Sequence, residues 1–157
     1  MRRILCLDLG TDLGYAIIED NVIVEYGNRC FSFKDEKARP GKRYKAFSNF
    51  ISYINKLSPV NEVAYEDVKA HSGTLAAHVY GGYRGLLLAW CEYAGKRCRP
   101  VGVGTIKKHA TGKGNAKKPA MIDAANNILL LKTDRLRQTT DDNEADAICL
   151  ADYVIEN

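Results

Sequence analysis

The feature of the sequence that most constrains the fold is a short apolar stretch near its beginning that holds one carboxylate. Residues 4–9 read Ile-Leu-Cys-Leu-Asp-Leu, and a run of this length and hydrophobicity is typical of a buried strand. Gly10 and Gly14 bracket a predicted tight turn, so a second strand should follow as the other half of a hairpin. A buried carboxylate is costly unless something positive or hydrogen-bonding meets it. Asp8 is therefore either a turn former at the strand end or part of a polar site.

The rest of the chain alternates between strand and helix patterns. Predicted strands cover residues 3–9, 14–19, 22–33, 60–68 and 97–103. Predicted helices cover 43–57, 75–94, 116–131 and 142–155, with one short helical turn at 104–109. Residues 34–42 and 133–140 read as a loop and a polar linker. Three hairpin-connected strands followed by a helix and another strand predict an α/β fold with a mixed sheet.

Length and composition bound the class of protein. The chain has 157 residues, which fits a single domain over 1–157. No apolar run approaches the roughly 20 residues that span a bilayer, and residues 4–7 are too short for a signal peptide. We therefore expect a cytoplasmic protein without a membrane partner. The five cysteines are scattered without a CxxC pair, which favours reduced thiols over a zinc site or disulfides. His71 is expected to be a solvated loop residue.

A basic block lies in the second half of the chain. Residues 96–118 contain eight lysines and arginines and no acid, a pattern that favours a surface for phosphates over a merely solvated loop. Within the block, residues 111–118 combine two glycines with three lysines, but the spacing is not that of a P-loop. A helix capped by Asn115 would still offer free backbone N–H groups to a DNA phosphate.

Three carboxylates lie in apolar surroundings in separate segments. Asp8 is in the first strand, Glu66 near the end of a later strand, and Asp146 inside the last helix. Asp142 and Asn143 precede Asp146 by four and three residues, so they share its helical face. Carboxylates gathered in this way repel unless a cation lies between them, and hard oxygen ligands select Mg²⁺ or Mn²⁺. Two such ions can activate water for phosphodiester hydrolysis; otherwise the acids are helix caps and ion-pair partners.

The helix predicted over 75–94 carries glycines in its middle, at positions 81, 82 and 85. Glycine costs up to about 1 kcal/mol per site in a helix. Small residues here would let another backbone come close. The close neighbour could be the sheet, a second helix or a second copy of the chain.

Taken together, these motifs resemble the RuvC family of Holliday junction resolvases, within the ribonuclease H-like superfamily. The resemblance covers almost the whole chain, and the short length and the Asp-Asn-Glu-Ala-Asp motif at 142–146 are closest in pattern to bacteriophage members. It implies a ribonuclease H-like fold, with a mixed five-stranded sheet and helices on both faces. It also implies a homodimer that nicks two strands of a four-way DNA junction, using two Mg²⁺ ions per active site, in the cytoplasm of a bacterial host if the chain is phage-encoded.

The resemblance assigns roles to individual residues. Asp8, Glu66 and Asp146 match the family's metal-binding acids. The fourth family acid falls at Asn143, so either Asp142 replaces it, the site has one charge fewer, or the residue is an inactivating change. The family's junction wedge, an aromatic residue, falls at Lys69, so the chain departs from the family's pattern at this position. The helix around Arg84 corresponds to the family's dimer helix. The DNA-binding residues expected on this basis are Lys69, Arg84, Lys107, Lys108, Lys113, Asn115, Lys117 and Lys118.

Three functions follow from these patterns. The first is a metal-dependent endonuclease for branched DNA, with Asp8, Glu66, Asp142 and Asp146 as the catalytic acids. The second is a protein that binds branched DNA without cutting it, because Asn143 weakens the metal site. The third is another ribonuclease H-like enzyme that cuts RNA in RNA/DNA hybrids.

Overall fold

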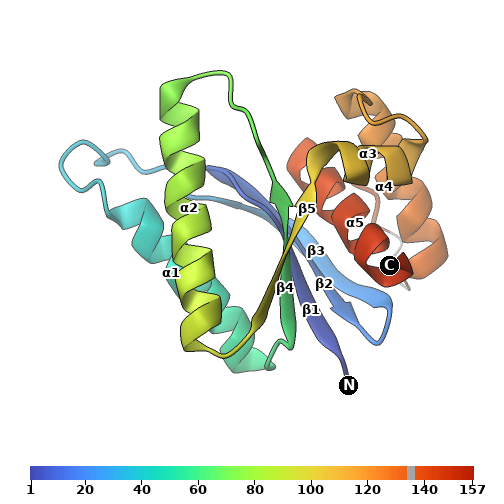
Figure 1. Cartoon of the computed structure of the whole chain (residues 1–157), viewed down its shortest axis with the longest axis horizontal. Helices are drawn as coiled ribbons and strands as arrows, with labels where there is room; N and C mark the ends of the chain where they lie inside the picture. Colours follow the sequence, from blue (N-terminus) through green and yellow to red (C-terminus); the bar gives the residue numbers. More distant parts are fainter. Residues whose placement is uncertain (134–136) are drawn as a thin grey trace.

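The computed structural model describes residues 1–133 and 137–157, and Figure 1 shows the chain as a central sheet with helices on two sides. The strands are β1 (Arg3–Asp8), β2 (Asp12–Glu19), β3 (Val22–Cys30), β4 (Glu62–Asp67) and β5 (Arg97–Gly102). The helices are α1 (Lys42–Leu57), α2 (Thr74–Tyr93), α3 (Val103–Thr111), α4 (Lys118–Lys132) and α5 (Asp142–Glu156).

The sheet has the mixed topology that the sequence predicts. Its strand order is β3-β2-β1-β4-β5. β1 pairs antiparallel with β2, and β2 pairs antiparallel with β3. β4 lies parallel to β1, and β5 parallel to β4. β5 is an edge strand, which is where its Pro100 is tolerated because a proline has no N–H for the ladder. The α/β prediction, with the first three strands antiparallel, is confirmed.

Helices cover both faces of the sheet, and strand alternation decides which residues meet which layer. Figure 1 shows α1 and α2 on one side and α3, α4 and α5 on the other. In β1, Ile4 and Cys6 pack in the core cluster that includes α5, whereas Leu5 and Leu7 pack in the cluster with α1 and α2. The sheet therefore separates two cores, and even-numbered residues of β1 face α5.

Several predicted boundaries differ from the structure. Gly14 lies inside β2 and does not close a turn. β3 ends at Cys30 and not at residue 33. The Phe31 N–H still donates to the facing Thr11 carbonyl, at 2.7 Å, but β2 begins only at Asp12, so β3 has no partner strand beyond this point. The single turn predicted at 104–109 is the longer helix α3, which ends on Gly112 in the left-handed region (φ 78°).

The C-terminal helices begin close to where their sequences predict. α4 starts at Lys118, so its N-cap is Lys117 and not Asn115. α5 starts at Asp142, and its N-cap Asp141 accepts a hydrogen bond from the Glu144 N–H at 2.9 Å. Of the predicted linker, residues 134–136 lie outside the described part of the chain.

All five cysteines are free thiols, as their spacing predicts. Across the part of the chain that the structure describes, no helix is both long and apolar enough to cross a bilayer.

Candidate functional site

Strand alternation places Asp8 and Glu66 side by side at one end of the sheet. β1 and β4 run parallel, with Leu7 opposite Tyr65, so their carboxyl ends lie at the same edge. Asp8 shares its face with Cys6, and Glu66 shares its face with Ala64; Cys6 and Ala64 both pack in the core under α5. Both carboxylates therefore point to the face that α5 covers.

The start of α5 reaches this edge because Gly14 of β2 has no side chain. Gly14 is the strand partner of Asp8. A Cβ on Gly14 would overlap the backbone carbonyl of Asn143 in the first turn of α5. The helix backbone thus lies directly on β2, with buried Ala145 and Ala147 continuing the close contact. This contact brings the acidic first turns of α5 to the ends of β1 and β4.

The acids interact strongly once they are assembled. Burial, the neighbouring charges of Glu66, Asp146 and Asp142, and a hydrogen bond to Glu66 hold the pKa of Asp8 well above its ordinary range. Burial also raises the pKa of Glu66. Burial and the charge of Glu66 raise the pKa of Asp146 to about 7. Close carboxylates cannot all ionise without a counter-charge. Asp8 and Glu66 share a hydrogen bond, and Asp146 interacts with them through charge, so the three form one acid cluster.

Two lysines lie close enough to act on this cluster. The charge of Lys107, from α3, lowers the pKa of both Glu66 and Asp146. Lys118, from the first turn of α4, forms an ion pair with Asp142 and lowers the pKa of that carboxyl through their hydrogen bond. Asp142 is therefore at the rim of the cluster, with its carboxylate engaged by Lys118.

The donor set fits a hard divalent cation, although its present arrangement is not that of a loaded site. Within residues 1–133 and 137–157, no three His, Cys, Asp or Glu side chains are arranged to hold a metal ion. The Asp8 and Glu66 side chains are instead hydrogen-bonded to each other. Carboxylates are nevertheless the ligands that Mg²⁺ uses in proteins, and burial together with mutual repulsion raises the pKa of Asp8 and Asp146. A central cation would relieve this repulsion.

The predicted DNA-binding residues of the basic block line an exposed strip next to this site. Lys108 is near the end of α3. In the loop that follows, the Thr111 hydroxyl accepts a hydrogen bond from the Lys113 N–H at 3.2 Å. A cavity of about 460 Å³ lies along this loop and the start of α4. Its lining includes three of the predicted residues, Lys113, Asn115 and Lys117. These three are exposed, and so are Lys108 and Lys118.

The two remaining predicted DNA contacts lie apart from that strip. Lys69 follows β4, is largely exposed and pairs with Asp67. Arg84 is exposed on α2, where its Nε donates to the Tyr65 hydroxyl at 3.2 Å. Arg84 therefore lies on the face of the sheet opposite Glu66, because Tyr65 packs in the core with α1 and α2.

Sequence reasoning missed two contacts that position the acids. The role of Gly14 is close packing against α5, which the motif alone does not distinguish from a turn. The Lys118–Asp142 pair links two helix starts that are 24 residues apart in the sequence. The signal available for it was only the basic character of the segment.

Sequence comparison finds no match, whereas structural comparison finds chains of similar fold. No family model matches the chain, and no curated protein matches it. Thermus thermophilus RuvC bound to a Holliday junction substrate superposes with a TM-score of 0.77 and 19% identity, covering 96% of this chain and 91% of that one. A second Thermus thermophilus RuvC structure superposes with a TM-score of 0.75 and 20% identity, covering 95% of this chain and 90% of that one.

A eukaryotic protein matches as well. The yeast mitochondrial Holliday junction resolvase superposes with a TM-score of 0.75 and 12% identity, covering 98% of this chain and 78% of that one. At these identities the likeness establishes the fold, and it extends over nearly the whole chain. The chain therefore has the RuvC-like fold of these Holliday junction resolvases.

Proposed function

We propose that this chain is a Mg²⁺-dependent endonuclease that resolves four-way DNA junctions by paired nicking. The observation that carries the proposal is the convergence of Asp8, Glu66 and Asp146, from β1, β4 and α5, into one cluster beside Lys107. The solved structures of this fold include a RuvC in complex with a Holliday junction substrate. Together, the cluster and the fold favour a nuclease over a purely structural role.

Asp8, Glu66 and Asp146 would hold the metal, with Asp142 or Asn143 as a further ligand. When bound, Mg²⁺ activates water and stabilises the leaving oxygen of a phosphodiester. Asp8 interacts with all the other acids, because burial and then the charges of Glu66, Asp146 and Asp142 raise its pKa. Release of the Lys118 ion pair would free Asp142 to turn inward, so this pair sets whether the fourth carboxylate is available.

The basic strip would hold the DNA backbone next to the acids. The lysines in the second half of α3, in the loop after it and at the start of α4 would neutralise phosphates irrespective of sequence. Lys107 and Lys118 connect this strip to the acid cluster, because both act on the pKa of Asp146. A strand that runs along the strip would thus be delivered with a phosphate at the cluster.

The exposed face of α2 would form the contact between two copies. Gly81 and Gly85 are exposed, and a Cβ on either would meet open space. Gly82, in contrast, is covered by the Tyr44 ring. Small residues four apart allow two helices to approach closely. Two copies joined in this way would present two acid clusters to one junction, as paired nicking requires.

The direct test is cleavage of a labelled four-way junction in Mg²⁺, compared with a linear duplex of the same sequence. We expect symmetric nicks in the junction only, and their loss in Asp8→Asn. Asp123→Asn changes an exposed acid on α4 and should cut as the unchanged protein does. Equal cutting of both DNAs, or cutting by Asp8→Asn, would refute the proposal.

A second candidate, binding of branched DNA without cutting, is favoured by the state of the fourth ligand. Asp142 is engaged by Lys118, and Asn143 supplies only a neutral amide. In this case the unchanged protein would retard junctions in gels without nicking them. Asn143→Asp would then introduce cleavage, whereas the nuclease proposal predicts cleavage without it.

A further inference from the structure

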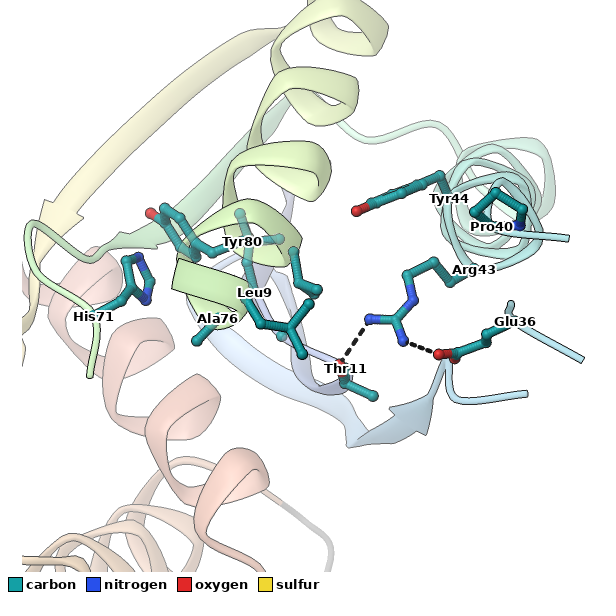
Figure 2. Close-up of a pocket in the computed structure, with 12 residues that line it drawn as sticks. Leu9, Thr11, Glu36, Pro40, Arg43, Tyr44, His71, Ala76 and Tyr80 are labelled. Atoms are coloured by element: carbon teal, nitrogen blue, oxygen red, sulfur yellow. Dashed lines mark hydrogen bonds and ion pairs between the residues drawn. The ribbon is translucent and has the colours of Figure 1, made fainter. Parts of the chain in front are cut away.

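A cavity of about 570 Å³ lies between α1, α2 and the loop that follows β1, and Figure 2 shows the side chains around it. Its volume is within the range of small-molecule sites. One wall is Tyr44 and Arg43 of α1, and the opposite wall is His71 and Tyr80. Leu9, at the foot of the cavity, directly follows the acid Asp8.

The walls combine aromatic faces with a fixed cation. The His71 and Tyr80 rings pack at 4.7 Å between centroids. Figure 2 shows the Tyr44 ring reaching from α1 toward α2, with its hydroxyl leading. The Arg43 guanidinium is held by the Thr11 hydroxyl, at 3.2 Å, and by the Glu36 carboxylate. Aromatic rings and a guanidinium plane are the surfaces on which unpaired bases stack.

The cavity is connected to the acid cluster through the backbone of β4. The Tyr80 hydroxyl donates to the Glu66 carbonyl at 2.9 Å and accepts from the Val68 N–H at 3.0 Å. The cavity opens on the face of the sheet that carries α1 and α2, opposite the acids but at the same carboxyl end of β1 and β4. A DNA strand crossing this edge would therefore meet the acids on one face and the cavity on the other.

A segment that supplies part of the cavity wall carries positive charge. Residues 34–45, which lead into α1, hold six lysines and arginines and two acids. Both acids are already neutralised, because Asp35 pairs with Lys42 at 2.9 Å and Glu36 pairs with Arg43. Lys34, Lys37 and Lys45 are exposed. This excess complements a phosphate backbone and is separate from the basic block at 96–118.

We propose that this cavity captures one unpaired base of the branched DNA, with the base between Tyr44 and the His71–Tyr80 pair and its phosphates against residues 34–45. The inference rests on the proposed function, because it takes branched DNA as the substrate. It adds a base-binding site on the face opposite the acids. Capture would fix the strand near the acid cluster, since Tyr80 links the cavity wall to Glu66.

The test uses junctions that carry 2-aminopurine at one position at a time near the branch point, mixed with Asp8→Asn protein so that no strand is cut. We expect the fluorescence at one position to change on binding, because the base leaves the DNA stack. Ala76 is exposed and lines the cavity, so adding Ala76→Trp fills the site from its rim. Asn49→Trp adds the same side chain at an exposed position of α1 outside the cavity.

Ala76→Trp should abolish the fluorescence change and weaken junction binding by about tenfold, as expected for one lost stacked base, whereas Asn49→Trp should do neither. Replacing the reporting base by an abasic site should weaken binding to the unfilled protein but not to Ala76→Trp. Equal behaviour of both tryptophan variants, or a changed oligomeric state in Ala76→Trp alone, would overturn the base site. If the unchanged protein cuts junctions in that case, the proposed function still stands. If it binds no junction at all, both proposals fall.

Discussion

Removing one charge from the acid cluster should stabilise the metal-free protein, and the gain should depend on pH. Asp146 is the informative position, because burial and the charge of Glu66 raise its pKa from 3.8 to about 7. Asp146→Asn keeps the size of the side chain and cannot ionise. The substitution therefore isolates the cost of the charge from the cost of changed packing.

The size and sign follow from linkage between proton binding and folding. Between pH 3.8 and about 7 the folded protein binds the Asp146 proton and the unfolded chain does not, so stability falls as pH rises through this window. Each tenfold change in proton affinity is worth about 1.36 kcal/mol, which gives a total of roughly 4 kcal/mol. About 1.5 kcal/mol of this is already lost at pH 5, and nearly all of it at pH 8.

The assay is urea unfolding of metal-free protein at pH 5 and pH 8. The free energy of unfolding of Asp146→Asn should exceed that of the unchanged protein by roughly 4 kcal/mol at pH 8 and by about 1.5 kcal/mol at pH 5. Mg²⁺ at pH 8 should raise the stability of the unchanged protein more than that of Asp146→Asn, because a ligand stabilises the form that binds it. Asp123→Asn, at its exposed position, should change stability by less than about 0.5 kcal/mol at either pH.

A destabilisation by Asp146→Asn of equal size at both pH values would refute this reasoning. It would mean that Asp146 contributes hydrogen bonds and packing, and that the carboxylates do not repel one another across the cluster. A pH-independent gain would also count against it, since only the ionised form carries the cost.

Two further predictions concern the neighbours of the acids. Gly14→Ala should lower the free energy of unfolding by about 1–3 kcal/mol through overpacking against α5, as measured in urea, and should lose junction cutting. Gly10→Ala, whose added Cβ meets only ordinary contacts, should keep its stability in the same unfolding assay. Lys107→Ala removes a charge that lowers the pKa of nearby acids, so the pH profile of cutting should move up by about one unit; Lys108→Ala, at the adjacent exposed position, should leave the profile in place, and an unmoved profile in Lys107→Ala would contradict the assignment.

The layer order could be predicted from sequence because it depends on local periodicity. A short apolar run indicates β1, and apolar residues at helical spacing indicate α1 and α5. These signals do not depend on distant contacts. The confirmed mixed sheet follows from the short connections between its first three strands and the helices before and after β4.

The arrangement of the site was only partly predictable, because it depends on contacts between distant segments. Asp8 and Glu66 could be paired from their places at strand ends. The tight seat of α5 on Gly14 could not, since a glycine after a strand reads first as a turn signal. The cavity beside Tyr44 was also missed, because its walls come from three segments with no common motif.

The acid cluster and the cavity share the same pieces of backbone, and this has a consequence for how the chain would select its substrate. Leu9 lines the cavity one residue after Asp8, and the Tyr80 hydroxyl holds the carbonyl of Glu66. A base that packs against the Tyr80 ring would therefore restrain the strand end that carries one acid. Intact duplex offers no unpaired base, so it would bind the basic surfaces without gaining this restraint. Branched DNA would then be selected because only a bound base restrains the end of β4 that carries Glu66. This selection needs no aromatic wedge at the position of Lys69.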